Sequence, residues 1–239
     1  MSREQVLAAT FMKLADTLGD DFDALDFLQY LAERSTAILG ASAAGLVLAD
    51  QRGHLQQVAS TSHSARVFGV IALSIARGPT EEAYRAGEPV VNVPVKRAAA
   101  RWPRFTSAAS DLGFHSVHAF PLRHRNEVLG ALTLFFEKPA RLTGEDAFLA
   151  DALVRVATIG LLQERTPRQK ELVAERLQDV LTERVELEQA KGVVAERATV
   201  SVEDAFELLL AYSRIESRRL RDVVRGVLDG SLGVPSLLR

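Results

Sequence analysis

The stretch HSVHAFPLRHRNEVLGALTLFF, residues 115–136, decides the fold class of this chain. It contains two runs of β-branched, aromatic and aliphatic residues, His115–Leu122 and Val128–Phe136, separated by the charged residues 123–127. Such side chains favour extended strands, and a short polar segment between two runs is typical of a hairpin. The stretch therefore predicts two neighbouring antiparallel strands.

Further helices and strands are predicted on the amino-terminal side of this pair. Residues 2–39 carry apolar side chains at helical spacing in two stripes, which indicates two helices. Two short strand-like runs, residues 43–49 and 55–61, lie on either side of a turn at residues 50–53. Helices that flank an antiparallel sheet indicate the α+β class rather than a wound parallel sheet.

After Pro139 the chain becomes helical. Thr143 is the expected N-cap of a helix, with Asp146 three residues later to complete a capping box. Beyond Thr166 and Pro167, which are expected to kink or restart the helix, apolar residues recur at heptad spacing. These heptad residues are Val173, Leu177, Val180, Leu187 and Val194. Such a row needs a partner helix: a parallel dimeric coiled coil is the simplest source, and packing within the chain is the alternative.

Two further short helices are predicted near the carboxyl end. Ser201 precedes a first turn rich in acids, Ser217 is placed to cap the final helix, and Gly230 would end it. Each of these helices, like the one before them, has one apolar face. Together the three predict a minimal bundle.

Composition excludes several classes of protein. The 239 residues contain no cysteine, which removes disulfides, thiolate metal sites and thiol nucleophiles. The formal charge of −2 argues against indiscriminate coating of nucleic acid, so any such contact must be local. No apolar run approaches the ~20 residues that span a bilayer, and the acidic start differs from a signal peptide. We therefore expect a cytoplasmic protein without membrane contact.

Basic side chains concentrate near the carboxyl end. They are Arg214, Arg218, Arg219, Arg221 and Arg225. Arg218, Arg221 and Arg225 follow helical spacing and are expected on one face, where guanidinium groups would match phosphate oxygens. A solvated helix face is the alternative. Tyr212 is placed either to stack on an unpaired base or to join the core.

A second cationic position lies earlier on the long helix. Arg184 and Lys191 are seven residues apart, within about 20° of each other around a helix, and Gly192 leaves the adjacent backbone open. A phosphate can dock at such a place. The alternative is that Gly192 admits a neighbouring helix while the two cations extend from the seam into water.

The stretch Arg184–Leu228 resembles the ANTAR family of RNA-binding antitermination domains. The matching elements are Glu188–Gly192, Ala195–Arg197, Ala205–Phe206 and the basic third helix at Arg218–Leu220. The resemblance implies a three-helix bundle that binds paired stem-loops in messenger leaders and prevents terminator formation. It favours RNA contact at the earlier cationic position too. Ser213 and Ser217 depart from the alanine and asparagine that are usual in the family.

Residues 22–162 resemble a GAF domain, with support from the Phe-Pro-Leu and Leu-Gly-Ala-Leu runs of the central strand pair. The resemblances imply an α+β chain with a GAF-like antiparallel sheet and flanking helices, a long coiled-coil helix and a C-terminal three-helix bundle. We assign residues 1–165 to the sensor domain with its N-terminal helices. Residues 166–239 are assigned to the coiled-coil helix and the RNA-binding domain.

The sequence contains no recognisable catalytic constellation. His115 and His118 would point to opposite faces of a strand, so they cannot share a metal ion, and a structural role is expected for both. Common nucleophile, metal and nucleotide motifs are missing, so we expect no enzyme, no catalytic residue, no metal and no cofactor. A further group of side chains either borders a small-ligand pocket or forms plain core: Trp102, Phe105, Phe114, Phe120, Arg123 and Arg125.

One main hypothesis and one alternative follow. The chain is interpreted as a signal-responsive RNA-binding regulator, a homodimer that acts on leader stem-loops. A small molecule or a protein would provide the signal at the GAF-like domain, through an unassigned ligand site, by shifting the population of two helix arrangements. The alternative is a sensor and dimerisation module whose C-terminal bundle binds a protein partner or duplex DNA.

Overall fold

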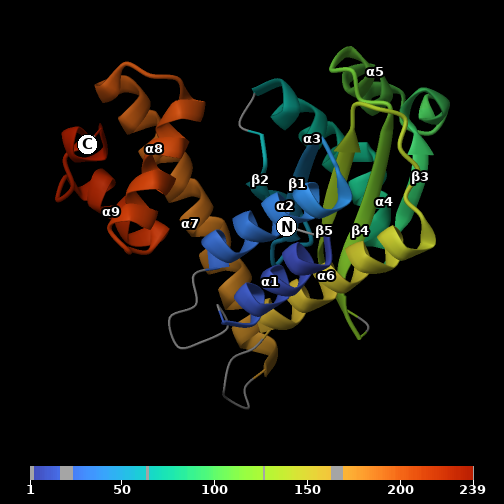
Figure 1. The fold of residues 1–239 in the computed structure, drawn as a ribbon, viewed down its shortest axis with the longest axis horizontal. Helices are drawn as coiled ribbons and strands as arrows, with labels where there is room; N and C mark the ends of the chain where they lie inside the picture. Colours follow the sequence, from blue (N-terminus) through green and yellow to red (C-terminus); the bar gives the residue numbers. More distant parts are fainter. Residues whose placement is uncertain (1–2, 17–23, 63–64, 126, 163–168, 239) are drawn as a thin grey trace.

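The fold consists of one antiparallel sheet with helices on both faces and a helical bundle at its side (Figure 1). A computed structural model describes residues 3–16, 24–62, 65–125, 127–162 and 169–238. Their elements are, in chain order, α1 (Arg3–Asp16), α2 (Ala24–Leu39), β1 (Ala43–Ala49), β2 (Leu55–Ser60), α3 (Ala65–Arg77), α4 (Pro79–Ala86), β3 (Val90–Pro94), the 3₁₀ helix η1 (Val95–Ala98), α5 (Pro103–Asp111), β4 (Ser116–His124), β5 (Glu127–Phe136), α6 (Gly144–Leu162), α7 (Gln169–Ala198), α8 (Val202–Ile215), α9 (Leu220–Asp229) and η2 (Val234–Leu238).

The sheet has the strand order β2-β1-β5-β4-β3, and every neighbouring pair is antiparallel. The predicted central strand pair is confirmed as β4 and β5, which are hydrogen-bonded neighbours. The predicted turn between β1 and β2 is also confirmed. Asp50 Oδ1 accepts hydrogen bonds from the backbone N–H groups of Arg52 and His54, both at 2.8 Å. The α+β class therefore holds.

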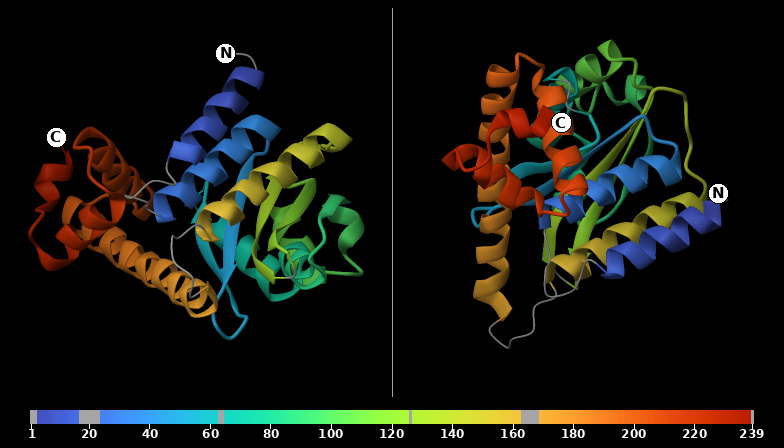
Figure 2. Two further views of the ribbon diagram at one scale, coloured as in Figure 1. Left: turned by 90° about the horizontal axis from the view of Figure 1, so that it is seen from below. Right: turned by 60° about the vertical axis from the view of Figure 1, so that its left-hand side comes forward.

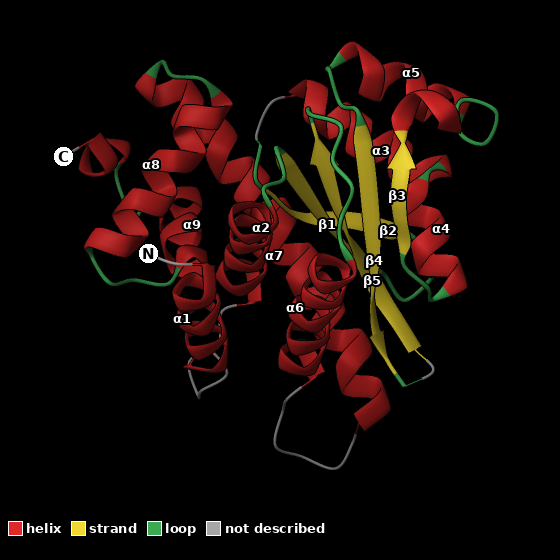
Figure 3. Ribbon diagram, turned by 45° about the vertical axis from the view of Figure 1, so that its right-hand side comes forward, coloured by secondary structure: helices red, strands yellow, loops and turns green. Residues whose placement is uncertain are grey.

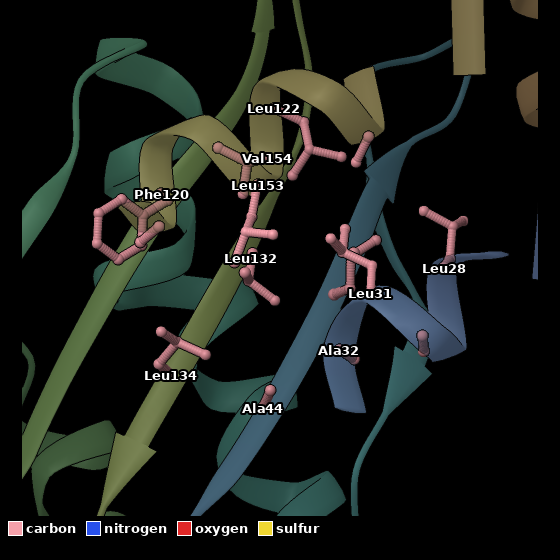
Figure 4. Packing of buried hydrophobic residues seen from close by; sticks show 14 of the residues in the cluster. Leu28, Leu31, Ala32, Ala44, Phe120, Leu122, Leu132, Leu134, Leu153 and Val154 are labelled. Carbon is pink, nitrogen blue, oxygen red and sulfur yellow. The ribbon is translucent and has the colours of Figure 1, made fainter. Parts of the chain in front are cut away.

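Helices cover both faces of the sheet, and successive side chains of a strand point to opposite faces. Each strand therefore contributes residues to two cores. On β1, Leu46 and Leu48 pack toward α2 and α6, in the core shown in Figure 4. Val47 packs instead into a second core with residues of α3 and α5. Figure 3 shows α1, α2 and α6 on one side of the sheet. The helices α3, α4 and α5 cover the other.

The predicted three-helix bundle forms from α7, α8 and α9, and it has an apolar core of its own. Leu187 and Val194, two of the heptad residues, are buried in this core. At these two positions the residues pack within the chain rather than in a dimeric coiled coil, since α8 and α9 supply the apolar partner. The side chains of Val173, Leu177 and Val180 lie outside the described part of the structure.

The bundle also contacts the sheet domain. Figure 2 shows α7 running beside the blue and teal elements, with α8 and α9 beyond it. α7 contacts both β2 and α2, and α9 contacts α2. The β2 edge of the sheet is thereby covered by the long helix, which removes one exposed edge strand.

Two of the three predicted caps are confirmed. Thr143 and Asp146 form a reciprocal capping box at α6, each accepting a hydrogen bond from the other's backbone N–H at 3.1 Å. Ser201 caps α8 by accepting from Asp204 N at 3.0 Å. The cap expected at Ser217 is wrong: α9 begins two residues later than a Ser217 cap requires, and its N-cap is Arg219.

Candidate nucleic-acid interface

The turn between α8 and α9 carries most of the predicted basic residues. Ser217 has a left-handed backbone, with φ of 51°, and this lets the chain reverse direction within a few residues. Ser213, which stands where the ANTAR family usually has alanine, fixes the turn. Its hydroxyl donates to the carbonyl of Arg218 at 2.7 Å, and its own carbonyl accepts from Arg218 N at 2.9 Å.

The amino end of α9 is a place where an anion can bind. The first amide groups of any helix have no partner within the helix, and they lie at the positive end of its dipole. The N-cap Arg219 makes no side-chain cap, because a guanidinium group only donates hydrogen bonds. Arg218 is exposed, and its side chain has no ion-pair partner among the described residues. Two arginines, Arg218 and Arg219, therefore directly precede the helix end that offers these backbone donors.

The remaining arginines of α9 lie along its surface. Arg221 and Arg225 are one helical turn apart, as predicted, but Arg218 precedes the helix and does not share their face. Arg221 is half-buried and lies 3.9 Å from the carboxylate of Asp222. Arg225 is exposed, donates to Glu186 of α7 at 3.1 Å, and its pKa is raised mainly by this hydrogen bond.

The end of α8 places Arg214 and Tyr212 differently. Arg214 is exposed and forms an ion pair with Glu33 of α2, at 3.7 Å between Nη2 and Oε2. This contact joins the basic region to the sheet domain. Tyr212 is half-buried and packs against the core of the bundle, so only part of its ring is available for stacking.

Arg184 and Lys191 lie inside the protein rather than on an exposed face. Lys191 is only 1% exposed and Arg184 only 8% exposed. Both pair with one carboxylate, Glu188: Lys191 Nζ donates to its two oxygens at 3.1 and 2.9 Å, and Arg184 Nη2 lies within 2.5 Å of Oε1. The ammonium group also lies 5.6 Å from the ring centroid of Phe206 on α8.

The expectation that these two cations form an exposed docking face is therefore wrong. Burial lowers the pKa of Lys191, and the hydrogen bond and charge of Glu188 oppose this shift. Burial likewise lowers the pKa of Arg184, again against the charge of Glu188. Glu188 was not among the predicted site residues, although its spacing of four residues from Arg184 and three from Lys191 is that of helical ion pairs. The spacing does not reveal that the two cations are buried, with Lys191 beside Phe206 of α8.

Gly192 is exposed, and a Cβ atom added there would meet nothing within 4 Å. The alternative explanation, that this glycine admits a neighbouring helix, is therefore wrong. An open stretch of helix backbone remains beside the buried cations. The predicted phosphate contact at Gly192 stays a prediction.

The aromatic residues that could border a ligand pocket lie inside the cores of the sheet domain. Trp102, Phe105 and Phe114 are buried in the core on the α3–α5 side, and Phe120 is buried on the α2–α6 side. These aromatic residues form plain core. In the part of the chain that the structure describes, no group of His, Asp and Glu residues is arranged so that it could hold a metal ion.

His118 and His115 differ in their surroundings. His118 is fully buried in β4, where its Nδ1 accepts from the backbone of Asn92 at 3.0 Å and its ring meets Phe136 edge-on. Burial lowers the pKa of His118 to about 4, so the ring is neutral at pH 7. His115 is exposed, and its Nδ1 lies 2.9 Å from the carbonyl of Gly113.

The geometry defines a class of protein: a helix-covered antiparallel sheet joined through a long helix to a small helical bundle with a cluster of arginines at one turn, as in sensors fused to nucleic-acid-binding domains. Comparison with family models identifies the two parts. Residues 23–161 match the GAF domain, and residues 175–228 match the ANTAR domain. The chain belongs to the GAF family and has the GAF–ANTAR architecture. It is an RNA-binding antitermination regulator with a sensor domain.

Solved structures support the fold of the sensor part. The GAF domain of a phosphoenolpyruvate-protein phosphotransferase from Coxiella burnetii is similar at a TM-score of 0.51 and 13% identity, covering 67% of this chain and 95% of that one. The GAF domain of the Acinetobacter phosphoenolpyruvate-protein phosphotransferase gives 0.50 and 14%, covering 67% and 93%. The free methionine-R-sulfoxide reductase from Neisseria meningitidis, solved with its substrate, gives 0.51 and 19%, covering 74% and 90%.

The chain matches none of the curated protein sequences with which it was compared. Both matched ranges fall within the predicted domains, 1–165 and 166–239. The boundary between residues 165 and 166 lies in the segment 163–168, outside the described residues, and stays a prediction. Within the described helices, none combines the length and the apolar character that crossing a membrane requires.

Proposed function

We propose that the chain is a signal-responsive antiterminator whose α8–α9 turn binds the phosphate backbone of leader stem-loops. The observation that carries this proposal is the amino end of α9. This helix end offers amide groups without partners inside the helix, and Arg218, Arg219 and Arg221 lie next to it in the chain. Helix amino ends bind phosphate, and arginine matches phosphate oxygens with two parallel hydrogen bonds.

The RNA surface is narrower than the sequence predicted. Arg214, Arg225 and the open backbone at Gly192 are retained as flanking contacts, with Tyr212 at the edge. The buried Arg184 and Lys191 hold the bundle together instead of meeting RNA. A stem-loop would therefore lie across the turn.

Signal response is assigned to the contact between the two domains. Arg214 pairs with Glu33 of the GAF domain, and α9 contacts the same helix α2. In this arrangement α2 lies beside part of the RNA surface. A signal that moves α2 would shift the population toward a form in which Arg214 is released for RNA. Two copies of the chain would present two such turns to paired stem-loops, which is why we retain the predicted homodimer.

The test is a gel-shift titration of the full chain at several salt concentrations, with a tandem stem-loop RNA recovered by crosslinking in cells. Arg218→Ala is expected to weaken binding and to reduce the salt slope by about 0.7–0.9, the contribution of one phosphate contact. Arg52→Ala, at the exposed β1–β2 turn, is the control for loss of one charge.

Two results would refute the proposal. One is unchanged RNA affinity in the Arg218→Ala protein. The other is tighter binding of a duplex DNA of equal length than of the stem-loop RNA, which would favour the sequence-based alternative of a DNA-binding bundle.

A further inference from the structure

A hollow of about 440 Å³ lies at the β3 edge of the sheet, away from the bundle. It is bordered by β3, the following 3₁₀ helix η1, the start of β4 and the loop that leads into α6. Its lining includes five polar or basic residues beside Pro94, Pro139 and Ala140: Asn92, Arg97, His115, Ser116 and Arg141. The volume falls in the range of small-molecule sites.

The walls of the hollow are tied together by hydrogen bonds. Asn92, which has a left-handed backbone with φ of 57°, interrupts the pairing of β3 with β4. Its side-chain amide accepts from the N–H of Leu142 at 2.8 Å and donates to the carbonyl of Leu142 at 3.3 Å. The hydroxyl of the buried Ser116 accepts from Ala140 N at 3.3 Å. The loop before α6 is thus held against two strands, so the hollow has a fixed shape.

The charge of the lining has one sign. Arg97 comes from η1 and Arg141 from the loop before α6, and both side chains are exposed. Neither guanidinium group has an ion-pair partner in the described ranges of the chain. The lining residues include no Asp or Glu. Two uncompensated guanidinium groups around one cavity favour an anionic occupant.

The hollow is separate from the two apolar cores. On the α3–α5 side the space above the sheet is filled by Trp102, Phe105 and Phe135, whose rings contact one another. Arg123, another basic residue of the domain, pairs with Glu88 and is not part of the hollow. A charged ligand therefore has a better place at the β3 edge than between the sheet and these helices.

We propose that this hollow binds a small organic anion through a phosphate or carboxylate group held between Arg97 and Arg141. The ligand would connect η1 with the loop that begins α6, and α6 leads along the chain toward α7. All residues of this proposed binding site belong to the sheet domain, so anion binding does not depend on the RNA-binding bundle. Its use as the sensed signal rests on the proposed function.

Calorimetric titration of the full chain, without RNA, tests the binding. The probes are inorganic phosphate, citrate and adenosine monophosphate, with uncharged adenosine as the control ligand. At least one anion is expected to bind while adenosine does not, and Arg97→Ala and Arg141→Ala are each expected to weaken that binding at least tenfold. Arg52→Ala, which removes the same charge from the opposite edge of the sheet, should bind as the unaltered chain does.

The pattern of binding identifies the chemistry. Preference for adenosine monophosphate over citrate assigns a phosphate ester, and the reverse assigns a polycarboxylate. No binding of any anion at millimolar concentration, or equal binding by all three variants, would overturn the proposal. The calorimetric titration contains no RNA, so its failure would not affect the proposal that the α8–α9 turn binds RNA. Conversely, a failed gel-shift titration with RNA would not affect the proposed anion site.

Discussion

Glu188 is the residue whose replacement is expected to destabilise the bundle most selectively. Its carboxylate is the shared ion-pair partner of Arg184 and Lys191, both of which are buried. In Glu188→Gln the two cations lose this negative charge while they remain buried. The change is nearly isosteric, so any loss of stability reports on charge rather than on packing.

The magnitude follows from burial. Removing one partner of a fully buried ion pair costs about 3–5 kcal/mol, because an uncompensated charge remains inside the protein. The Glu188 side chain is 43% exposed, so water already screens part of the interaction. We therefore expect a loss of about 2 kcal/mol in the free energy of unfolding of the bundle.

The pH dependence gives a second signature. Without Glu188, burial lowers the pKa of Lys191 further, since the opposing hydrogen bond and charge are gone. Between the folded and the unfolded pKa of a lysine the unfolded chain binds more protons, so stability increases with pH. The gap in stability between Glu188→Gln and the unaltered protein should therefore narrow as the pH rises toward the ordinary pKa of lysine.

Urea unfolding followed by circular dichroism measures both effects. Glu196→Gln, an exposed position on the same helix, is the matched control and should change stability by less than about 0.5 kcal/mol. Lys191→Met should remain folded and bind RNA, because the partner left behind, Glu188, is partly exposed to water and still pairs with Arg184. A Glu188→Gln protein as stable as the control, or a folded Lys191→Met protein that no longer binds RNA, would refute this account.

Three further predictions concern the RNA surface, the domain contact and the sheet. Gly192→Ala should stabilise α7 by up to about 1 kcal/mol, because the added methyl group meets nothing, and should weaken RNA binding; unchanged affinity in the gel shift would remove Gly192 from the surface. Glu33→Gln should raise RNA affinity by at most about fivefold, since an exposed ion pair contributes up to about 1 kcal/mol; Glu127→Gln is its control, and weaker binding would contradict the proposed restraint. His118 remains neutral in the fold down to about pH 4, whereas the unfolded chain takes up its proton near pH 6.5. The free energy of unfolding should thus fall by about 3 kcal/mol from pH 6.5 to pH 4. Urea titrations at each pH should show this fall in the exposed control His54→Gln and not in His118→Gln.

Periodicity and local capping chemistry were enough to predict several elements of this protein, although not the start of α9. The strand pair at residues 115–136, the turn at Asp50 and the caps at Thr143 and Ser201 all depend on residues close together in the sequence. The motif between Glu188 and Leu220 is likewise specific enough to identify the ANTAR domain from the sequence alone. Local interactions act over a few residues, so the sequence alone contains them.

Which charged residues face solvent was decided only when the helices packed. Arg184 and Lys191 have the spacing of an exposed pair, but both are buried in the folded chain, and Glu188 compensates their charges. The pairing of Arg214 with Glu33, 181 positions away in the chain, likewise has no trace in local pattern. Burial depends on which surfaces meet in three dimensions, and side-chain spacing along one helix does not specify them.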